Sequence, residues 1–306
     1  MPGKENGAPA PRKLKILMLH GPLPLHFLLA PLHHILLTFD SGYTQSGSLF
    51  HGKTRALEKI LIKAFPPPPP PPHNKNISPS AFSGVTLIYP TAPILLHPAD
   101  IPGFDPSTPD SRDAYGWWKK DDSTDEYIGL DKGLATIRDA IKDAGGVDGV
   151  IGFSQGGCAA ALVASLLEPD RASAFASHQA SHPDANALAY PPGWAELQKE
   201  FGQLKFAVSY SGFYAPGDRY AAFYEPKIST KVLNVIGSLD SVVGEDRSKG
   251  LVERCVGGEG RVVMHPGGHF VPVGKEMAGV VVGFIRGCLE GEKAKEESVE
   301  DMDVPF

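Results

Sequence analysis

The chain has 306 residues, of which 42% are hydrophobic and 21% are charged, a balance that is ordinary for a soluble globular protein. The length suits one large α/β domain or two small ones. The formal net charge of -6 argues against a general nucleic-acid-binding protein. The three cysteines (Cys158, Cys255 and Cys288) lack the spacing of metal ligands or of a disulfide framework, which favours a reducing compartment, the cytoplasm or the nucleus.

Both ends of the chain are expected to lie outside the folded domain. Residues 1–12 are rich in Gly, Pro and Ala, and residues 290–306 are acidic, so we expect two disordered tails. The basic residues 12–15 resemble the start of a secretory signal only superficially, because His20, Gly21 and prolines interrupt the apolar stretch that follows. We therefore expect no secretion. Since no run of about 20 apolar residues occurs, we also expect no membrane-spanning helix.

The N-terminal half of the chain is expected to contain two strands and two helices. In chain order these are a strand at residues 15–20, a helix at 48–65, a strand at 84–89 and a helix at 126–143. Residues 22–42 are an atypical apolar insertion whose pattern fits neither the periodicity of a helix nor that of a strand. Residues 66–83 are expected to be an exposed, proline-rich loop. The long loop at 94–125 carries Trp117 and Trp118, which either line a substrate pocket or anchor the loop on the core.

A serine motif lies at the centre of the chain. Gly152-Phe-Ser-Gln-Gly156 fits the pattern Gly-x-Ser-x-Gly, with a short apolar strand at residues 147–153 before the serine and a helix of small residues at 158–167 after it. This is the context of a nucleophile elbow, in which the serine lies in a strained turn and glycines let neighbouring backbone approach closely. The pattern predicts that Ser154 is a nucleophile and that Cys158 is a small buried helix residue.

The C-terminal half is expected to contain three more strands and two helices. In chain order these are strands at residues 204–210 and 231–237, a helix at 244–255, a strand at 260–265 and a helix at 275–289. The polar segment at 169–203 is either a mobile lid or a surface insertion, and Phe213 is a further candidate for a substrate pocket. Six apolar strands that alternate with helices predict one α/β domain at residues 13–289. We expect a doubly wound, mainly parallel sheet with helices on both faces.

A serine nucleophile needs a base. In a doubly wound sheet the site lies beyond the carboxyl ends of the strands, and after a nucleophile elbow the acid and then the histidine follow along the chain. His269 lies in a Gly-Gly-His turn after the last strand, where the backbone is free to point back at Ser154. His265 would still be within the strand and is expected to be structural.

The acid and the oxyanion donors are predicted from the same placement. Asp240 is the favoured acid because it follows the end of an apolar strand, whereas Asp218 lies in a polar turn and Asp246 has a capping role in a helix. The N–H of Gln155, at the start of the helix after the serine, is the expected first donor to an oxyanion. A loop next to His20-Gly21 is expected to supply the second.

Five motifs occur in one order along the predicted domain. They are Leu19-His-Gly21, Tyr43-Thr-Gln-Ser-Gly47, Tyr89-Pro-Thr-Ala-Pro93, residues 148–157 and His265-Pro-Gly-Gly-His-Phe-Val-Pro272. Together they resemble the fungal family of serine hydrolases, an α/β-hydrolase group. The resemblance implies esterase or thioesterase activity and a triad at Ser154, Asp240 and His269, and we expect no cofactor and no metal. Some members of that family release polyketide acyl chains in secondary metabolism, so the implied partner is a small acyl ester or thioester, in some cases presented by an acyl carrier protein.

The chain departs from that family between Gly21 and Tyr43. In the family the His-Gly pair runs directly into the Tyr-Thr-Gln-Ser-Gly turn, and the residue after the pair, matched here by Tyr43, supplies the second oxyanion N–H. In this chain residues 22–42 intervene, and Pro22 has no N–H. Either the insertion loops out and Tyr43 still reaches the hole, or the segment is a retained intron. If Pro22 takes that place, the alternative is a catalytically impaired α/β-hydrolase-like binding protein.

Overall fold

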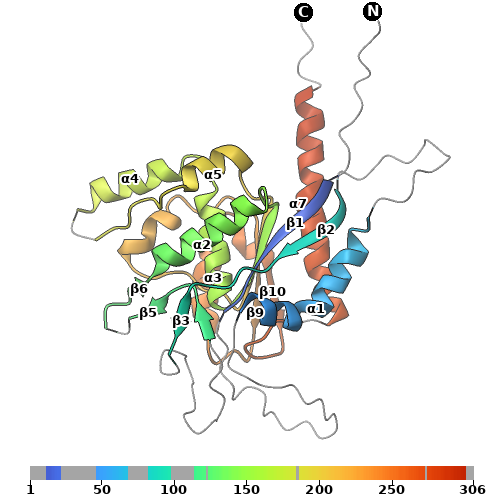
Figure 1. The fold of residues 1–306 in the computed structure, drawn as a ribbon, viewed down its shortest axis with the longest axis horizontal. Coiled ribbons are helices and arrows are strands. Elements are labelled where there is room, and N and C mark those ends of the chain that lie inside the picture. The colour runs from blue at the N-terminus through green and yellow to red at the C-terminus, as the bar shows by residue number, and fades with distance from the viewer. Residues whose placement is uncertain are drawn as a thin grey trace, which may run out of the picture.

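The computed structural model describes residues 12–21, 46–67, 82–97, 114–121, 123–183, 186–272 and 274–300, with side chains as far as residue 290. Its centre is a six-stranded sheet with the strand order β10-β9-β8-β7-β1-β2 (Figure 1). The strands are β1 (Arg12–Leu19), β2 (Phe82–Ile88), β7 (Gly149–Phe153), β8 (Phe206–Tyr210), β9 (Val232–Gly237) and β10 (Val262–His265). Every neighbouring pair is parallel, which confirms the predicted fold class.

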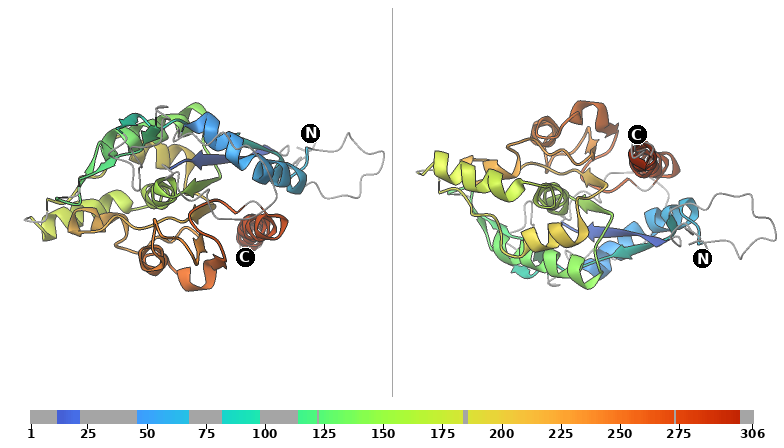
Figure 2. Two further views of the ribbon diagram at one scale, coloured as in Figure 1. Left: turned by 90° about the horizontal axis from the view of Figure 1, so that it is seen from below. Right: turned by 90° about the horizontal axis from the view of Figure 1, so that it is seen from above.

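Helices cover both faces of this sheet (Figure 2). One buried apolar cluster contains side chains of α1 (Gly47–Ala64) and α7 (Lys275–Glu300), and the other contains side chains of α2 (Leu130–Asp143) and α3 (Gln155–Leu166). Strand β1 contributes to both clusters in alternation. Ile16 and Met18 belong to the first cluster, and Leu17 and Leu19 belong to the second. From Ile16 to Leu19 the strand is buried on both faces and apolar at every position, and this run is recognisable in the sequence.

The helix before the elbow begins later than its periodicity predicts. Its apolar face is the expected one, with Leu130, Leu134, Ile137 and Ile141 buried. The predicted first turn is instead β6 (Tyr127–Ile128), which pairs antiparallel with β5 (Lys119–Lys120). Gly129 separates the strand from the helix at a φ of 80°, a left-handed conformation that glycine adopts without steric cost.

A second antiparallel pair lies in the segment that was expected to be only a loop. It joins β3 (Ile94–Leu96) to β4 (Ala114–Gly116). Strands of two or three residues are too short to produce a periodic pattern, which explains why neither pair is apparent from the sequence. Both pairs lie outside the main sheet.

The segment at 169–203 contains two helices, α4 (Arg171–Ser181) and α5 (Trp194–Phe201). Phe175 of α4 and Trp194 of α5 are 1% and 0% exposed and belong to the cluster on the α3 side of the sheet. The segment is therefore anchored on the domain through these aromatic side chains. Whether part of it moves as a lid stays a prediction.

A buried ion pair joins this segment to the main sheet. Arg171 and Glu168 lie 2.5 Å apart with side chains that are 1% and 5% exposed. Glu168 also accepts hydrogen bonds from the backbone N–H groups of Ser229 and Thr230, just before β9. Arg171 donates to the carbonyl oxygen of Pro226 at 2.7 Å. Each charged group thus has several partners, as a buried ion pair requires.

The remaining elements lie in the C-terminal half. They are the short 3-10 helices η3 (Asp218–Phe223) and η4 (Gly258–Arg261) and the helix α6 (Glu245–Glu253). Helix α7 continues to Glu300 and so includes residues that were expected to form a disordered acidic tail. Most of residues 292–300 are Glu, Lys or Ala, which favour a helix. Within the described part of the chain, no helix is long and apolar enough to span a membrane.

Candidate active site

Ser154 lies in a tight turn between β7 and α3. Its φ is 56°, a conformation that non-glycine residues rarely adopt, and its N–H donates to the carbonyl oxygen of Tyr210 in β8 at 2.8 Å. A Cβ at Gly152 would collide with the carbonyl oxygen of Gly156, and a Cβ at Gly156 would collide with that of Leu19. The two glycines of the motif are therefore required by the backbone contacts around the turn.

The structure brings together the three residues that were predicted to act with one another. His269 Nε2 lies 2.9 Å from Ser154 Oγ, and His269 Nδ1 lies 2.8 Å from Asp240 Oδ2. Ser154 and His269 are 5% and 2% exposed, and the side chain of Asp240 is 1% exposed. The residues come from the ends of β7, β9 and β10, which meet at the carboxyl edge of the sheet.

The carboxylate of Asp240 is held in one orientation. Its Oδ1 accepts hydrogen bonds from the N–H groups of Val242 and Val243 at 3.0 and 2.9 Å, while Oδ2 faces His269. Burial by itself raises the pKa of Asp240, but the hydrogen bonds and charge of His269 and the N–H of Val243 outweigh it and the pKa is lowered. Because a carboxylate only accepts, the proton in its bond to His269 is on Nδ1. The Nε2 atom is then free to accept from the serine hydroxyl.

The competing candidates lie elsewhere. Asp218 is at the exposed start of η3. His265 is the last residue of β10, where burial lowers its pKa against the opposing charge of Asp240, and its ring contacts Phe270. Cys158 is fully buried in α3, and burial raises the pKa of its thiol, which confirms that it is a small interior residue.

The carboxyl end of β1 lies directly against the elbow. A Cβ at Gly21 would lie 2.5 Å from the carbonyl oxygen of Phe153, 2.8 Å from the nitrogen of Gln155 and 2.9 Å from Cβ of Ser154. The backbone leaving β1 therefore lies next to the amide that was predicted as the first oxyanion donor. Pro22 and Tyr43 lie outside the described residues, so the identity of the second donor stays a prediction.

The two adjacent tryptophans are core residues. Trp117 and Trp118 are 0% and 2% exposed, and the ring of Trp118 stacks on Tyr127 with a centroid distance of 4.7 Å. This supports the alternative in which they anchor their loop, because large indole rings gain more from burial than most side chains. Phe213 is 9% exposed and lies under the guanidinium of Arg247 at 4.4 Å. A role for these residues in a substrate pocket stays a prediction.

One feature of the elbow was missed in the sequence. The side chain of Gln155, and not only its N–H, is bonded in the site: Oε1 accepts from the N–H of Trp117 at 2.7 Å and Nε2 donates to the carbonyl oxygen of Trp118 at 2.9 Å. A Cβ at Gly116 would lie 3.1 Å from that Oε1, so the glycine leaves room for the bridge. In the sequence, the glycine before the two tryptophans indicates a close contact at this point, but it does not identify Gln155 as the residue that makes it.

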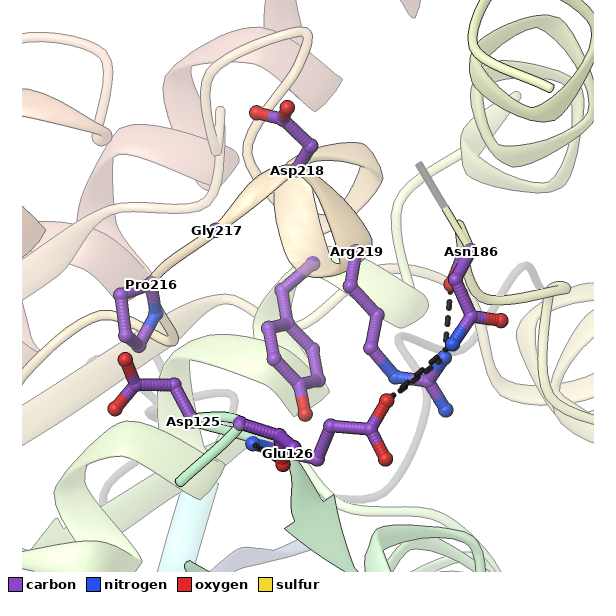
Figure 3. A pocket seen from close by; sticks show the side chains of 9 residues that line it. Asp125, Glu126, Asn186, Pro216, Gly217, Asp218 and Arg219 are labelled. Carbon is purple, nitrogen blue, oxygen red and sulfur yellow. Dashed lines mark hydrogen bonds and ion pairs between the residues drawn. The ribbon is translucent and has the colours of Figure 1, made fainter. Parts of the chain in front are cut away.

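A polar depression of about 360 Å³ lies between the β5–β6 turn and η3 (Figure 3). Three of its four charged side chains take part in ion pairs. Arg219 lies 3.8 Å from Glu126 and donates to the carbonyl oxygen of Asn186, and Asp125 lies 2.6 Å from Lys120. The depression is not lined by Ser154, Asp240 or His269. Among the described residues, no group of three or more His, Cys, Asp or Glu side chains could hold a metal ion.

The fold and the site together define a class of protein. A serine at a strand-to-helix elbow of a parallel sheet, bonded to a histidine that is bonded to an aspartate, with the chain order Ser, Asp, His, is the arrangement of α/β-hydrolases. Residues 35–281, more than half of the chain, match the model of the serine hydrolase (FSH1) family. The chain therefore belongs to this family of serine hydrolases, as the sequence motifs predicted.

Individual proteins resemble this chain at low sequence identity. A Schizosaccharomyces pombe protein named dihydrofolate reductase is 28% identical over 239 residues, which are 76% of this chain but 42% of that protein, so the chain spans less than half of that relative. Esterase OVCA2 of Danio rerio is 27% identical over 248 residues, 76% of this chain and 87% of the relative. The structure of Zea mays acyl-protein thioesterase 2 has the same fold, with a TM-score of 0.51, 17% identity, and coverage of 92% of this chain and 95% of that one.

Proposed function

We propose that the protein hydrolyses a carboxylic ester or thioester through an acyl-enzyme, with Ser154 as nucleophile, His269 as general base and Asp240 as the acid that orients it. The observation that carries this proposal is the unbroken hydrogen-bond chain from Ser154 Oγ through the imidazole to Asp240, with lengths of 2.9 and 2.8 Å. Such a chain lets the imidazole remove the hydroxyl proton as the oxygen attacks.

In the acylation step, Ser154 Oγ forms a bond to the carbonyl carbon while its proton moves to His269 Nε2. The tetrahedral intermediate then collapses as the bond to the leaving alcohol or thiol breaks, and His269 returns the proton to that group. In deacylation a water molecule replaces the serine as the attacking group, and the same proton transfers release the carboxylic acid. Asp240 stays ionised throughout and stabilises the imidazolium, in keeping with its lowered pKa.

Negative charge on the carbonyl oxygen requires N–H donors. The N–H of Gln155 is proposed as the first, because Gln155 is the first residue of α3 and helix N-termini carry partial positive charge. Tyr43 is proposed as the second, as the resemblance to the family implies. Each such donor is worth about 3 kcal/mol of transition-state stabilisation. Loss of the second donor would slow the reaction strongly without disturbing the hydrogen bonds of Ser154.

The substrate class is proposed at the level of an acyl ester or thioester. The name of the zebrafish relative, an esterase, supports the ester. Presentation of a thioester by an acyl carrier protein, for release in secondary metabolism, is a narrower form of the same proposal. The cytoplasm is the proposed location, with the nucleus as the alternative, and the three cysteines support this because each is a buried thiol outside any disulfide.

A fluorophosphonate probe tests the proposal, because it labels only an activated serine. Wild-type protein is expected to be labelled, and Ser154→Ala is expected to abolish the label. A variant lacking residues 22–42 shows whether the insertion matters. If neither the wild type nor this deletion variant is labelled at Ser154, the hydrolase proposal fails. Labelling of the deletion variant alone would support the alternative of an impaired, ligand-binding α/β-hydrolase.

A second experiment narrows the substrate. Paired oxygen and thio esters of the same acyl chain, from two to twelve or so carbons, are compared by kcat/KM, together with the same acyl group on phosphopantetheine and on a carrier protein. Faster turnover of the carrier-bound thioester than of the free phosphopantetheine thioester would support presentation by a carrier protein. Equal rates would argue against it. The Ser154→Ala variant gives the background rate for each substrate.

A further inference from the structure

Two parts of the chain that are distant in sequence form the region where the oxyanion is expected to lie. One is the elbow, with the N–H of Gln155, and the other is the carboxyl end of β1, with His20 and Gly21. The spacing between them is tight, since the missing Cβ of Gly21 would lie 2.8 Å from the Gln155 nitrogen. The catalytic effect of an oxyanion donor depends on its position to within a fraction of an ångström. Whatever fixes this spacing therefore affects the rate.

Trp117 is bonded to both parts. Its main-chain N–H donates to Oε1 of Gln155 at 2.7 Å, on the elbow side. Its indole Nε1–H donates to the main-chain carbonyl oxygen of His20 at 2.7 Å, on the β1 side. All three residues are less than 10% exposed, so these bonds are shielded from competition with water.

The elbow end of this connection is rigid because the Gln155 carboxamide is bonded at both of its ends. Oε1 accepts from Trp117 N–H, and Nε2 donates to the carbonyl oxygen of Trp118 at 2.9 Å. The side chain is thus held to the backbone of residues 117–118 by two hydrogen bonds. Because the side chain and the amide belong to one residue, the two bonds also restrict the direction of the Gln155 N–H.

The β1 end is equally constrained. His20 is fully buried, its Nε2 accepts from the N–H of Ala92 at 3.1 Å, and its ring lies 5.3 Å from the ring of Trp117. Burial, with a smaller contribution from the charge of Lys53, lowers the pKa of His20 to about 3. The imidazole is therefore neutral at physiological pH and holds its residue in place through ring packing and one hydrogen bond.

We propose that Trp117 is a positioning residue for the hydrolytic reaction: its two N–H groups hold Gln155 and His20, and so set the spacing between the two sides of the oxyanion site. The inference rests on the proposed hydrolase function. Under this proposal the indole nitrogen does more than fill the core. A phenyl ring would occupy most of the same volume, but it has no N–H to donate to His20.

Trp194 of α5 supplies a matched control. It is as fully buried as Trp117 and belongs to the same apolar cluster. Its indole N–H makes no hydrogen bond to any of the described residues. The substitutions Trp117→Phe and Trp194→Phe therefore remove the same number of atoms from the same core, but only the first removes a hydrogen bond to the β1 side of the site.

The test compares both variants with wild type in the full-length protein. We measure kcat and KM for a p-nitrophenyl ester, and the affinity for an alkyl boronic acid, which forms a tetrahedral adduct on Ser154 with an oxygen in the oxyanion position. Since loss of a whole donor costs about 100- to 1000-fold, we expect the misplaced donor in Trp117→Phe to lower kcat by about 10- to 100-fold. Boronate affinity should fall by a similar factor, with KM nearly unchanged. Trp194→Phe should keep both quantities within about threefold of wild type.

Equal losses in the two variants would show that Trp117 acts only through packing, and an unchanged Trp117→Phe would overturn the inference as well. Gln155→Leu tests the same connection from the elbow, and is decisive if Trp117→Phe does not fold. It is expected to lower kcat and boronate affinity together, and wild-type values for this variant would also overturn the inference. A wild-type protein that does not react with fluorophosphonate would remove the proposed function, which is a separate failure.

Discussion

Asp240→Asn changes one atom in the hydrogen-bond chain of the site and so tests the role proposed for this residue. In the wild type, Oδ1 accepts from the N–H groups of Val242 and Val243, and Oδ2 accepts from His269 Nδ1. An asparagine has only one oxygen for these three donors. The orientation of the asparagine amide determines which of these three hydrogen bonds remain.

The two backbone N–H groups select the amide orientation. If the amide oxygen stays with Val242 and Val243, its NH₂ group faces His269 Nδ1, and the imidazole is forced into the tautomer with the proton on Nε2. That proton points at Ser154 Oγ, and the imidazole no longer accepts the hydroxyl proton. The opposite orientation would leave two N–H groups facing an NH₂ group, at a cost of about 1–3 kcal/mol for each unsatisfied group. We therefore expect kcat to fall by about 10⁴, or about 5.5 kcal/mol in activation free energy.

The assay is ester turnover at neutral pH with stopped-flow detection, and circular dichroism shows that the variant is folded. The matched control is Asp218→Asn, which makes the same chemical change at the exposed start of η3 and should keep kcat within about twofold of wild type. A folded Asp240→Asn variant within tenfold of the wild-type kcat would refute the reasoning. So would a large loss in the Asp218→Asn control.

Two further predictions concern stability. His20 binds a proton in the unfolded chain below pH about 6.5 but not in the folded protein until pH about 3. The free energy of unfolding should therefore fall as the pH is lowered through this window, by about 2 kcal/mol between pH 6.5 and 5 from this residue alone. Urea unfolding at a series of pH values measures this free energy for the wild type and for His20→Gln, and its dependence on pH should be shallower in the variant. An equal dependence on pH in the two proteins would contradict the assignment. Glu168→Ala leaves Arg171 as a buried, unpaired charge and should lower the free energy of unfolding by about 3–5 kcal/mol. The control Glu245→Ala breaks the exposed pair with Lys249 and should lower it by less than about 1 kcal/mol. A loss of stability in Glu168→Ala no larger than in this control would show that the buried pair contributes little.

The six strands and the elbow were predictable because their sequence patterns have one physical cause. A strand covered by helices on both faces has few polar positions, and in β7 all five residues are apolar and buried. The glycines of the elbow are set by backbone contacts within a few residues along the chain or on the adjacent strand. The predicted grouping of Ser154, Asp240 and His269 follows from parallel topology, which places the carboxyl ends of all strands at one edge.

The connection through Trp117 was not predictable from the sequence, because it joins residues that are 38 and 97 positions apart through a side-chain amide and an indole. No periodicity or motif specifies such bonds. The helices at 171–201 were missed for a different reason. Helix α4 is rich in Ala and Ser and has only Phe175 as a large apolar residue in the core, so its amphipathic pattern is weak.

The close backbone contacts of the elbow have a consequence for how this site can change. Gly152 and Gly156 have no room for even a methyl group, so the nucleophile turn tolerates almost no variation. Residues 94–96, 114–116, 119–120 and 127–128 instead form two short antiparallel pairs outside the main sheet, and the hydrogen bonds of Trp117 join this region to Gln155 and His20. The backbone contacts that fix the nucleophile turn are therefore separate from the hydrogen bonds that fix the region around Trp117. Sequence change near the site is therefore expected to be tolerated in the region around Trp117 more readily than in the turn that carries Ser154.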